Sequence, residues 1–152
     1  MKYMAINELL HFEFHDANLK KIKFKNNHMI WKVSYIAATT RNKTNEKFYE
    51  DTGIKKATIT FENFHIESIV FPEAPITAAP SEYNNTLKKK QKSYKHCFIY
   101  YMDNLTSIDT NQYKTSFSFG GGLDQNFLTI QFSKSIIEWN KYTGTKERYR
   151  KD

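Results

Sequence analysis

Two histidines near the N-terminus are the first residues whose type and spacing suggest chemistry. His11 and His15 stand four residues apart, with Glu13 between them. On a helix this spacing can hold a metal ion, but the surrounding residues alternate as a strand does, and strand positions four apart are separated by about 13 Å. We therefore expect no metal or other cofactor here. We interpret His15-Asp16 as a structural turn whose histidine is hydrogen-bonded.

A second pair with chemical potential is His96-Cys97, a base next to a nucleophile. Neighbouring residues on a strand point to opposite faces, so these side chains cannot easily pair, and we expect Cys97 to be buried and inert. Gly120–Gly122 lacks the Lys-Ser/Thr and the helix that a phosphate-binding loop needs. We interpret these glycines as a hairpin loop that requires positive φ.

Carboxylates gather in two stretches. Glu46, Glu50 and Asp51 form one group, and Asp103 and Asp109 form the other. Paired carboxylates can do acid–base work, but sequence spacing does not place these side chains face to face. We interpret them as solvated surface residues.

A basic run with neighbouring tyrosines is the best nucleic-acid candidate in the chain. Lysines interleaved with aromatic residues are typical of proteins that bind single strands. The run comprises Lys88, Lys89, Lys90, Lys92 and Tyr94, within a lysine-rich segment that extends to Lys95. Against this interpretation, the chain has only three arginines and no recognisable nucleic-acid-binding motif. We expect a solvated, mobile connection.

The net charge of +7 is concentrated in two segments. Residues 81–96 carry five lysines against Glu82, and residues 143–152 carry four basic residues against two acidic ones. These two segments supply all but one of the net positive charges, so the rest of the chain is close to neutral. We therefore expect no positive groove on the folded body.

Tyrosines indicate a possible protein-binding surface. Tyr100 and Tyr101 are adjacent on a predicted strand, so one of them should face outward. Tyrosine gives a large contact area at little entropic cost and is common at protein interfaces. We expect an outward aromatic patch here, and the same holds for one face of Tyr113–Phe119.

The stretch Leu19–Ala37 positions the rest of the predicted sheet. Apolar residues recur at every second position, the period of a half-buried strand. These positions are Met29, Trp31, Val33, Tyr35 and Ala37. Just before them, Asn26 and Asn27 tolerate the positive φ of a two-residue hairpin turn.

Counting outward from that turn predicts the register of the hairpin. The predicted pairs are Lys25 with His28, Phe24 with Met29, Lys23 with Ile30, Ile22 with Trp31 and Lys21 with Lys32. The next pair would push Lys20 into the apolar face. We therefore predict a β-bulge at Lys20-Lys21, which brings Leu19 opposite Val33.

Further apolar runs predict the remaining strands. Ala57–Phe71 changes phase at Glu62-Asn63, where we expect a bulge in a strand long enough to serve two sheets. Prolines exclude a central strand from Pro72–Pro80, and Ser81–Tyr94 is either helical or a mobile loop. Other strands are expected at Leu9–Phe14, Ala17–Phe24, His96–Met102, Tyr113–Phe119, Leu128–Phe132 and Ile136–Tyr142.

Together these patterns predict a mainly β protein, a single-domain antiparallel β-sandwich or barrel of about eight or nine strands with at most one short helix. We place the domain at residues 1–142, with a long basic connection at 72–95 and a frayed basic tail at 143–152. The single Cys97 fits a reducing compartment, and no apolar run reaches the roughly 20 residues that cross a bilayer. We expect a cytoplasmic bacterial protein without a membrane partner.

The segment Phe14-His15-Asp16-Ala17-Asn18-Leu19, followed by Ile22 and the strand of Trp31, resembles the opening of a group of small bacterial all-β proteins. These uncharacterised proteins begin with a Phe-His-Asp-Ala/Ser-x-Ile/Leu corner, and some are of toxin-immunity type. The resemblance covers about the first quarter of the chain and carries no catalytic residues. It implies a compact β fold and a partner-binding role, in which Asp16 caps the turn and His15 packs or hydrogen-bonds.

Three functions from different classes are compatible with the sequence. The first is non-enzymatic binding of another protein through an exposed sheet face or loops, of which immunity-type neutralisation is one form. The second is weak binding of nucleic acid or another polyanion through Lys88–Lys95 and the C-terminal tail. The third is an enzyme or small-ligand binder whose site is assembled from distant residues. Of these we expect the first.

Overall fold

The computed structural model describes residues 3–15, 17–39, 41, 51–71 and 79–143. This part of the chain is mainly β, as the sequence predicts, with antiparallel strands and one short α-helix. The strands are β1 (Tyr3–Ile6), β2 (Phe12–Glu13), β3 (Ala17–Lys25), β4 (His28–Ala38), β5 (Thr52–Glu62), β6 (His65–Val70), β7 (Phe98–Asp109), β8 (Gln112–Gly120), β9 (Asn126–Phe132) and β10 (Lys134–Trp139), and the helix is α1 (Tyr83–Lys92). Short 3-10 turns lie at Leu9–His11 and Pro80–Glu82.

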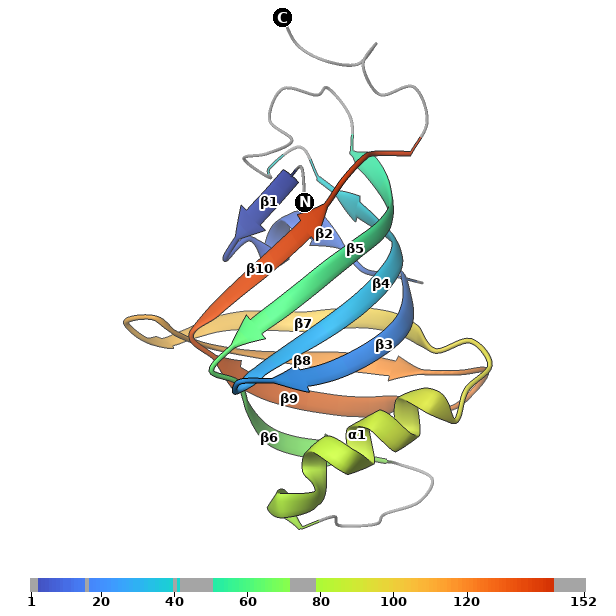
Figure 1. The fold of residues 1–152 in the computed structure, drawn as a ribbon, viewed down its shortest axis with the longest axis vertical. Helices are drawn as coiled ribbons and strands as arrows, with labels where there is room; N and C mark the ends of the chain where they lie inside the picture. Colours follow the sequence, from blue (N-terminus) through green and yellow to red (C-terminus); the bar gives the residue numbers. More distant parts are fainter. Residues whose placement is uncertain (1–2, 16, 40, 42–50, 72–78, 144–152) are drawn as a thin grey trace, which may run out of the picture.

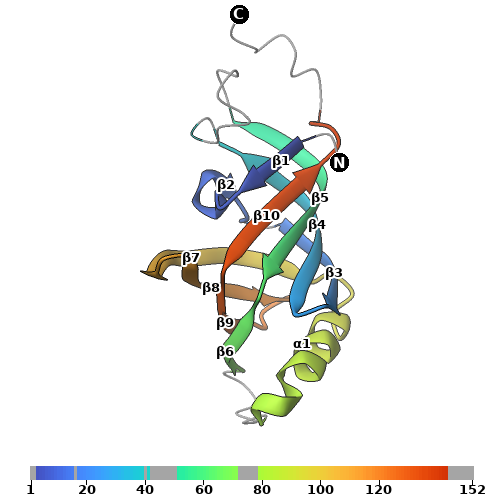
Figure 2. The ribbon, with the colours of Figure 1, turned by 60° about the vertical axis from the view of Figure 1, so that its left-hand side comes forward.

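All ten strands belong to one hydrogen-bonded sheet that folds over on itself (Figure 1). The strand order is β1-β10-β5-β4-β3-β7-β8-β9-β6, and β2 pairs with β4. In Figure 1, β10, β5, β4 and β3 run diagonally in front of β7, β8 and β9. Figure 2 shows α1 alongside the lower part of the sheet, far from β1. The path ends at β1 and β6, so the described strands form a folded sheet and not a closed barrel.

Two corners join the front and back halves of this sheet. At the first, β3 pairs with β4 along its length and with β7 at Ala17 and Asn18. At the second corner, β5 continues into β6 and β9 continues into β10. Because β5 pairs with β10 and β6 pairs with β9, the two continuous stretches bend together, at Asn63 and Ser133. Asn63 has a φ of +51°, and its side-chain amide donates to Ser133 Oγ over 3.0 Å. The change of phase predicted at Glu62-Asn63 is therefore confirmed, but it is a bend between β5 and β6 and not a bulge within one strand, and it lets this stretch serve both halves.

Aromatic rings from both halves fill the space between them. The Trp31 and Phe61 rings of the front half lie 4.7 and 5.8 Å from the Phe117 ring of the back half, centroid to centroid. Phe61 also lies 5.2 Å from Phe132. Tilted and edge-on ring pairs of this kind contribute about 0.5–1.5 kcal/mol each beyond the burial of their area. The aromatic core therefore holds the folded sheet together across its two layers.

The hairpin of β3 and β4 forms as predicted. Asn26 and Asn27 have φ values of +49° and +62°, and all five predicted cross-strand pairs are present. The register shifts by one residue between Leu19 and Lys21, so the bulge predicted at Lys20-Lys21 is confirmed.

The predicted apolar face of β4 is wrong beyond Val33. Tyr35 has a φ of +62°, and its side chain is 61% exposed. Buried positions continue instead at Ile36 and Ala38, while Ala37 is only half-buried. A residue in the left-handed region breaks the pleat, so the side chains after it change faces by one position.

The predicted strand Leu9–Phe14 is wrong in its first half. Leu9–His11 forms a 3-10 turn, which buries Leu9 and leaves Leu10 49% exposed. The strand that follows, β2, has two residues, and β1 has four. Neither is long enough to show a clear alternation in the sequence, which explains why the sheet has more strands than the eight or nine expected.

The sequence left helix and loop open for Ser81–Tyr94, and the structure forms α1 there. Tyr83, Leu87 and Gln91 recur at every fourth position and are turned toward the protein, with Leu87 fully buried. The Gln91 side-chain amide donates to the carbonyl oxygens of Leu19 and Lys20, over 3.3 and 3.2 Å. The helix is therefore anchored on the bulge of β3.

Parts of the predicted connection and tail, residues 72–78 and 144–152, lie outside the described residues. Within the residues that the structure does describe, no helix combines the length and the apolar composition needed to span a bilayer.

Replacing Asn26 with alanine is expected to lower the free energy of unfolding by about 1 kcal/mol, because alanine tolerates the left-handed region poorly. The matched control is Asn27→Gly, which suits the same backbone region and should keep or raise stability. Urea denaturation of both variants gives the comparison. Equal losses of stability in the two variants would show that the asparagines do not act by favouring the left-handed turn conformation.

Candidate functional site

The histidines near the N-terminus have structural roles. His15 Nδ1 donates to the Tyr100 carbonyl oxygen over 2.9 Å, which confirms the predicted hydrogen-bonded turn histidine. Its neighbour Asp16 lies outside the described residues. His11 Nδ1 lies 3.4 Å from the Glu8 carboxylate. Among the described side chains, no group of three or more His, Cys, Asp or Glu residues is arranged to hold a metal ion.

Cys97 is buried, as predicted, with 2% of its surface exposed. Burial raises the pKa of its thiol to about 12, so the group stays protonated at neutral pH and is a poor nucleophile. The neighbouring His96 is exposed, which fits side chains on opposite faces of the chain.

Tyr94 and Tyr100 hold the glycine loop through their hydroxyl groups. The Tyr94 hydroxyl accepts from Asn126 Nδ2 over 2.9 Å, and the Tyr100 hydroxyl donates to the Gly122 carbonyl over 3.0 Å. A Cβ at Gly121 would lie 2.6 Å from the Tyr94 ring, so this close approach requires glycine. Gly122 has a φ of +61°, which confirms the predicted positive φ in this loop.

Tyr94, Tyr100 and Tyr113 are therefore used in internal contacts, and the outward aromatic patch expected at Tyr100-Tyr101 stays a prediction. Tyr100 is half-buried, and Tyr113 is half-buried and stacks on Phe132 with ring centroids 5.8 Å apart. Tyr101 pairs with β8 through its backbone, and its side chain lies outside the described part of the structure.

The predicted basic run lies on α1. Its lysines are Lys88, Lys89, Lys90 and Lys92. The Lys90 ammonium lies 5.2 Å from the Phe71 ring centroid and 5.7 Å from that of Tyr94. Lys90 and Tyr94 are thus held in local contacts, whereas Lys89 and Lys92 are exposed, so binding at α1 stays a prediction.

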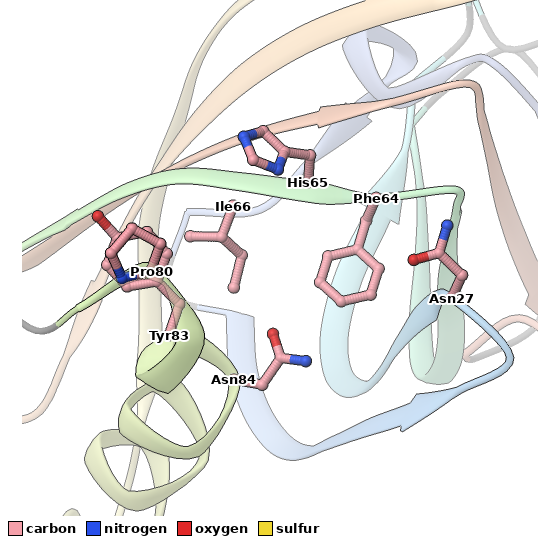
Figure 3. Close-up of a pocket in the computed structure, with 7 residues that line it drawn as sticks. All are labelled: Asn27, Phe64, His65, Ile66, Pro80, Tyr83 and Asn84. Atoms are coloured by element: carbon pink, nitrogen blue, oxygen red, sulfur yellow. The ribbon is translucent and has the colours of Figure 1, made fainter.

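A small hollow lies between the β3–β4 turn, β6 and the start of α1 (Figure 3). Its volume is about 200 Å³, below the roughly 300–1,000 Å³ of typical small-ligand sites. Phe64 and Ile66 point into this space, whereas His65 points to the other side of β6 (Figure 3). The lining contains no carboxylate, so the hollow has no acid–base pair.

The most distinctive surface lies on the outer side of β3, β4 and β5, the side turned away from β7–β9 (Figure 1). Eight exposed lysines gather there and beside it, and none was among the predicted site residues. They are Lys20, Lys21, Lys23 and Lys25 of β3, Lys32 of β4, Lys55 and Lys56 of β5, and Lys141 after β10. We call these eight lysines the basic face.

The hairpin register explains how the basic face forms. Lys21 and Lys32 are direct cross-strand partners. The bulge brings Lys20 and Lys21 to the surface together, and Lys23 follows two residues after Lys21 on the same side. The same alternation buries Ile22 against the core. One hairpin therefore supplies both the apolar side of the sheet and most of the basic face.

The basic face carries an excess of positive charge, with Glu138 of β10 as a neighbouring carboxylate opposite Thr58. None of its lysines forms an ion pair within the described residues. The lysine–carboxylate pairs that the structure shows lie elsewhere, Lys114–Glu67 at 2.7 Å and Lys134–Glu62 at 3.5 Å. Repulsion from Lys32, and next from Lys21, lowers the pKa of Lys23. An anion bound to this face would relieve that repulsion.

A broad hollow of about 900 Å³ forms the centre of the basic face. Five of the eight lysines line it, Lys20, Lys32, Lys55, Lys56 and Lys141. The small side chains of Ser34, Ala57 and Thr58 lie between them. Residues 140–143 border the hollow, and the Thr143 backbone N–H holds them against β5 by donating to the Gly53 carbonyl over 2.8 Å.

Tyr35 does not itself line the hollow, but its neighbours do. It follows Ser34 of the lining, and the flanking pairs Ser34–Lys56 and Ile36–Ile54 place it across from Lys55. A left-handed conformation costs an ordinary residue about 1–2 kcal/mol, and such strain is concentrated at functional sites. In this case it turns a large aromatic ring outward, beside the lysines.

The basic face was not predicted from the sequence, and the expectation of a body without a positive groove is wrong. A net charge calculated along the sequence cancels lysines against carboxylates that are far apart in the fold. Lys23 on β3 and Glu67 on β6 are an example. A signal was nevertheless present, because the predicted register already set Lys21 opposite Lys32.

Comparisons with protein-family models, with curated proteins and with solved structures found no significant match. The resemblance to bacterial immunity-type proteins therefore stays a prediction. What the chain can bind must be inferred from the basic face itself.

Proposed function

We propose that this protein is a non-enzymatic binding domain that holds a negatively charged macromolecule on the basic face. The observation that carries this proposal is the set of eight exposed lysines around a hollow of about 900 Å³, without a carboxylate partner in the described residues. Like charges placed opposite one another destabilise a sheet, so this arrangement is unfavourable unless it has a use. A bound polyanion supplies the missing counter-charge.

The extent of the basic face favours a polymer over a small anion. Its lysines run from Lys25, next to the hairpin turn, to Lys141, beyond the end of β10. They therefore cover the three neighbouring strands β3, β4 and β5, each about 4.8 Å from the next, and reach the residues that follow β10. A small anion contacts two or three of these lysines, whereas an extended polyanion contacts most of them at once.

An acidic partner protein, as in immunity-type neutralisation, is the form of this proposal that the sequence resemblance favours. The helix lysines of Lys88–Lys92 are the competing location, since the sequence pointed to them first. A cytoplasmic location is also part of the proposal, and the single, buried cysteine supports it, because such a chain needs no oxidising compartment.

The test is binding to immobilised heparin, a sulfated polyanion without bases or protein structure. The sheet variant carries Lys21→Gln, Lys32→Gln and Lys56→Gln. The matched control carries Lys88→Gln, Lys89→Gln and Lys92→Gln on α1, so both variants lose three charges. At about 1 kcal/mol per lysine, the sheet variant should bind about 100-fold more weakly than the wild-type protein.

The helix variant should keep most of the wild-type affinity, and salt should weaken the binding of both proteins. Equal losses in the two variants would mean that heparin senses net charge and not the basic face. Wild-type protein that fails to bind heparin at about 50 mM salt would also overturn the proposal.

A further inference from the structure

The composition of the basic face distinguishes between classes of polyanion. The basic face consists of lysines, with Glu138 of β10, opposite Thr58, as a neighbouring carboxylate on the same side of the sheet, and the three arginines of the chain are at positions 41, 148 and 150. Protein–protein interfaces are enriched in arginine and aromatic residues at their centre and depleted in lysine. Phosphate groups are bound by arginine and also by lysine as a point charge, so a face of lysines fits phosphate binding although the chain has few arginines.

The lining of the hollow has few large hydrophobic side chains. Ser34, Ala57 and Thr58 lie between its lysines, and Val33 and Tyr142 also line it. Large hydrophobic side chains are exposed at other places in the described residues, namely Met4, Ile6, Leu10, Val70, Ile108 and Leu123. None of these lines the hollow, where five of the lining residues are lysines.

Among the residues that the structure describes, Tyr35 is the one exposed large aromatic residue near the lysines. Its neighbours in the register are Ser34 and Lys55, both of which line the hollow. Bases of a single strand stack on exposed aromatic rings, while the bases of a duplex are already stacked on one another. A ring of this kind at the end of a row of lysines therefore fits an unpaired strand better than a duplex.

We propose that the ligand of the basic face is single-stranded nucleic acid, with its phosphates along the lysines and a base stacked on Tyr35. This inference rests on the proposed function and narrows it from polyanions in general to one class. The contact is to backbone and ring faces, so binding is largely independent of base sequence.

The experiment measures the fluorescence anisotropy of a labelled oligothymidine of 12 nucleotides, a length within the site size of known single-strand binders. If the five lysines of the hollow each neutralise one phosphate, the slope of log K against log salt concentration should be about −3.5. Tyr35→Ala should weaken binding about tenfold, Tyr35→Phe should keep it, and Tyr35→Trp should keep or strengthen it. Circular dichroism confirms that each variant is folded.

Competition separates this inference from the proposed function. The competitors are unlabelled oligothymidine, a 12-base-pair duplex and polyglutamate of matched charge, and we expect the single strand to compete best. If polyglutamate or the duplex competes better, or if Tyr35→Phe loses as much affinity as Tyr35→Ala, the inference is wrong. If heparin still binds in those cases, the proposed function stands without it. If neither heparin nor the oligonucleotide binds, both are wrong.

Discussion

Replacing Trp31 with alanine is expected to lower the free energy of unfolding by about 3–5 kcal/mol. Trp31 is fully buried, and its ring lies 5.4 Å from Phe61 in the front half of the sheet and 4.7 Å from Phe117 in the back half. The substitution removes both ring contacts and leaves a cavity between the layers. Domains of this size are stable by about 5–15 kcal/mol, so this loss is a large share of the total. Urea denaturation followed by circular dichroism measures it.

Two further variants show whether the loss of stability comes from the ring contacts in the core. Trp31→Phe keeps a ring between the layers, and it removes an indole N–H that has no hydrogen-bond partner among the described residues. We expect it to cost about 1–2 kcal/mol. Tyr35→Ala, on the same strand but at an exposed position, should change stability by no more than about 0.5 kcal/mol. If Trp31→Ala costs no more than Tyr35→Ala, the two halves are not held together by this core.

The hairpin of β3 and β4 was predictable because its determinants are local. Two asparagines set the turn, and the turn sets the register by counting. The bulge followed from a conflict that the sequence already contained, since without it Lys20 would be buried. The bend at Asn63 was visible for the same reason, as a change of phase in one long apolar pattern.

Other features depend on contacts that no local pattern records. Leu9 is buried because a 3-10 turn rotates it inward, and two- or four-residue strands such as β2 and β1 are held by their partners in the sheet. The left-handed conformation of Tyr35 is the clearest case. Tyrosine rarely adopts it, so alternation was the natural expectation, and only the structure shows that the pattern shifts there.

Predicting the basic face requires both the local strand register and the long-range pairing of strands. The four lysines of β3 could be assigned to the solvent side from the register alone, together with Lys32. Lys55, Lys56 and Lys141 join them only because β5 pairs with β4 and the chain after β10 lies against the start of β5. Net charge along the chain is therefore a poor guide to charge on one face of a sheet.

Removing charge from the basic face is expected to stabilise the protein while it weakens heparin binding about 100-fold. The variant with Lys21→Gln, Lys32→Gln and Lys56→Gln removes the two neighbours that most strongly lower the pKa of Lys23. We expect its melting temperature to exceed that of the wild-type protein by roughly 2–4 °C at neutral pH and low salt. The helix variant with Lys88→Gln, Lys89→Gln and Lys92→Gln is the control and should show a smaller change.

The pH dependence of the stability difference distinguishes relief of charge repulsion from a change in packing. In the folded protein the pKa of Lys23 lies below the 10.5 of a free lysine. Between the two values the unfolded chain binds more protons, so the stability of the wild-type protein rises with pH across that window. The advantage of the sheet variant should therefore be largest at neutral pH, shrink as the pH approaches 10.5, and also shrink in high salt.

Selection for stability alone would remove a cluster of lysines that destabilises the fold. A binding surface often keeps such a cluster, because activity and stability make opposite demands on it. The sheet variant tests both demands in one protein. A higher melting temperature together with lost heparin binding is the result that a functional polyanion site requires. A lower melting temperature, or a gain that is unchanged by pH and salt, would mean that these lysines stabilise the sheet through their aliphatic chains. The basic face would then have a structural explanation, and the proposed function would lose its main support.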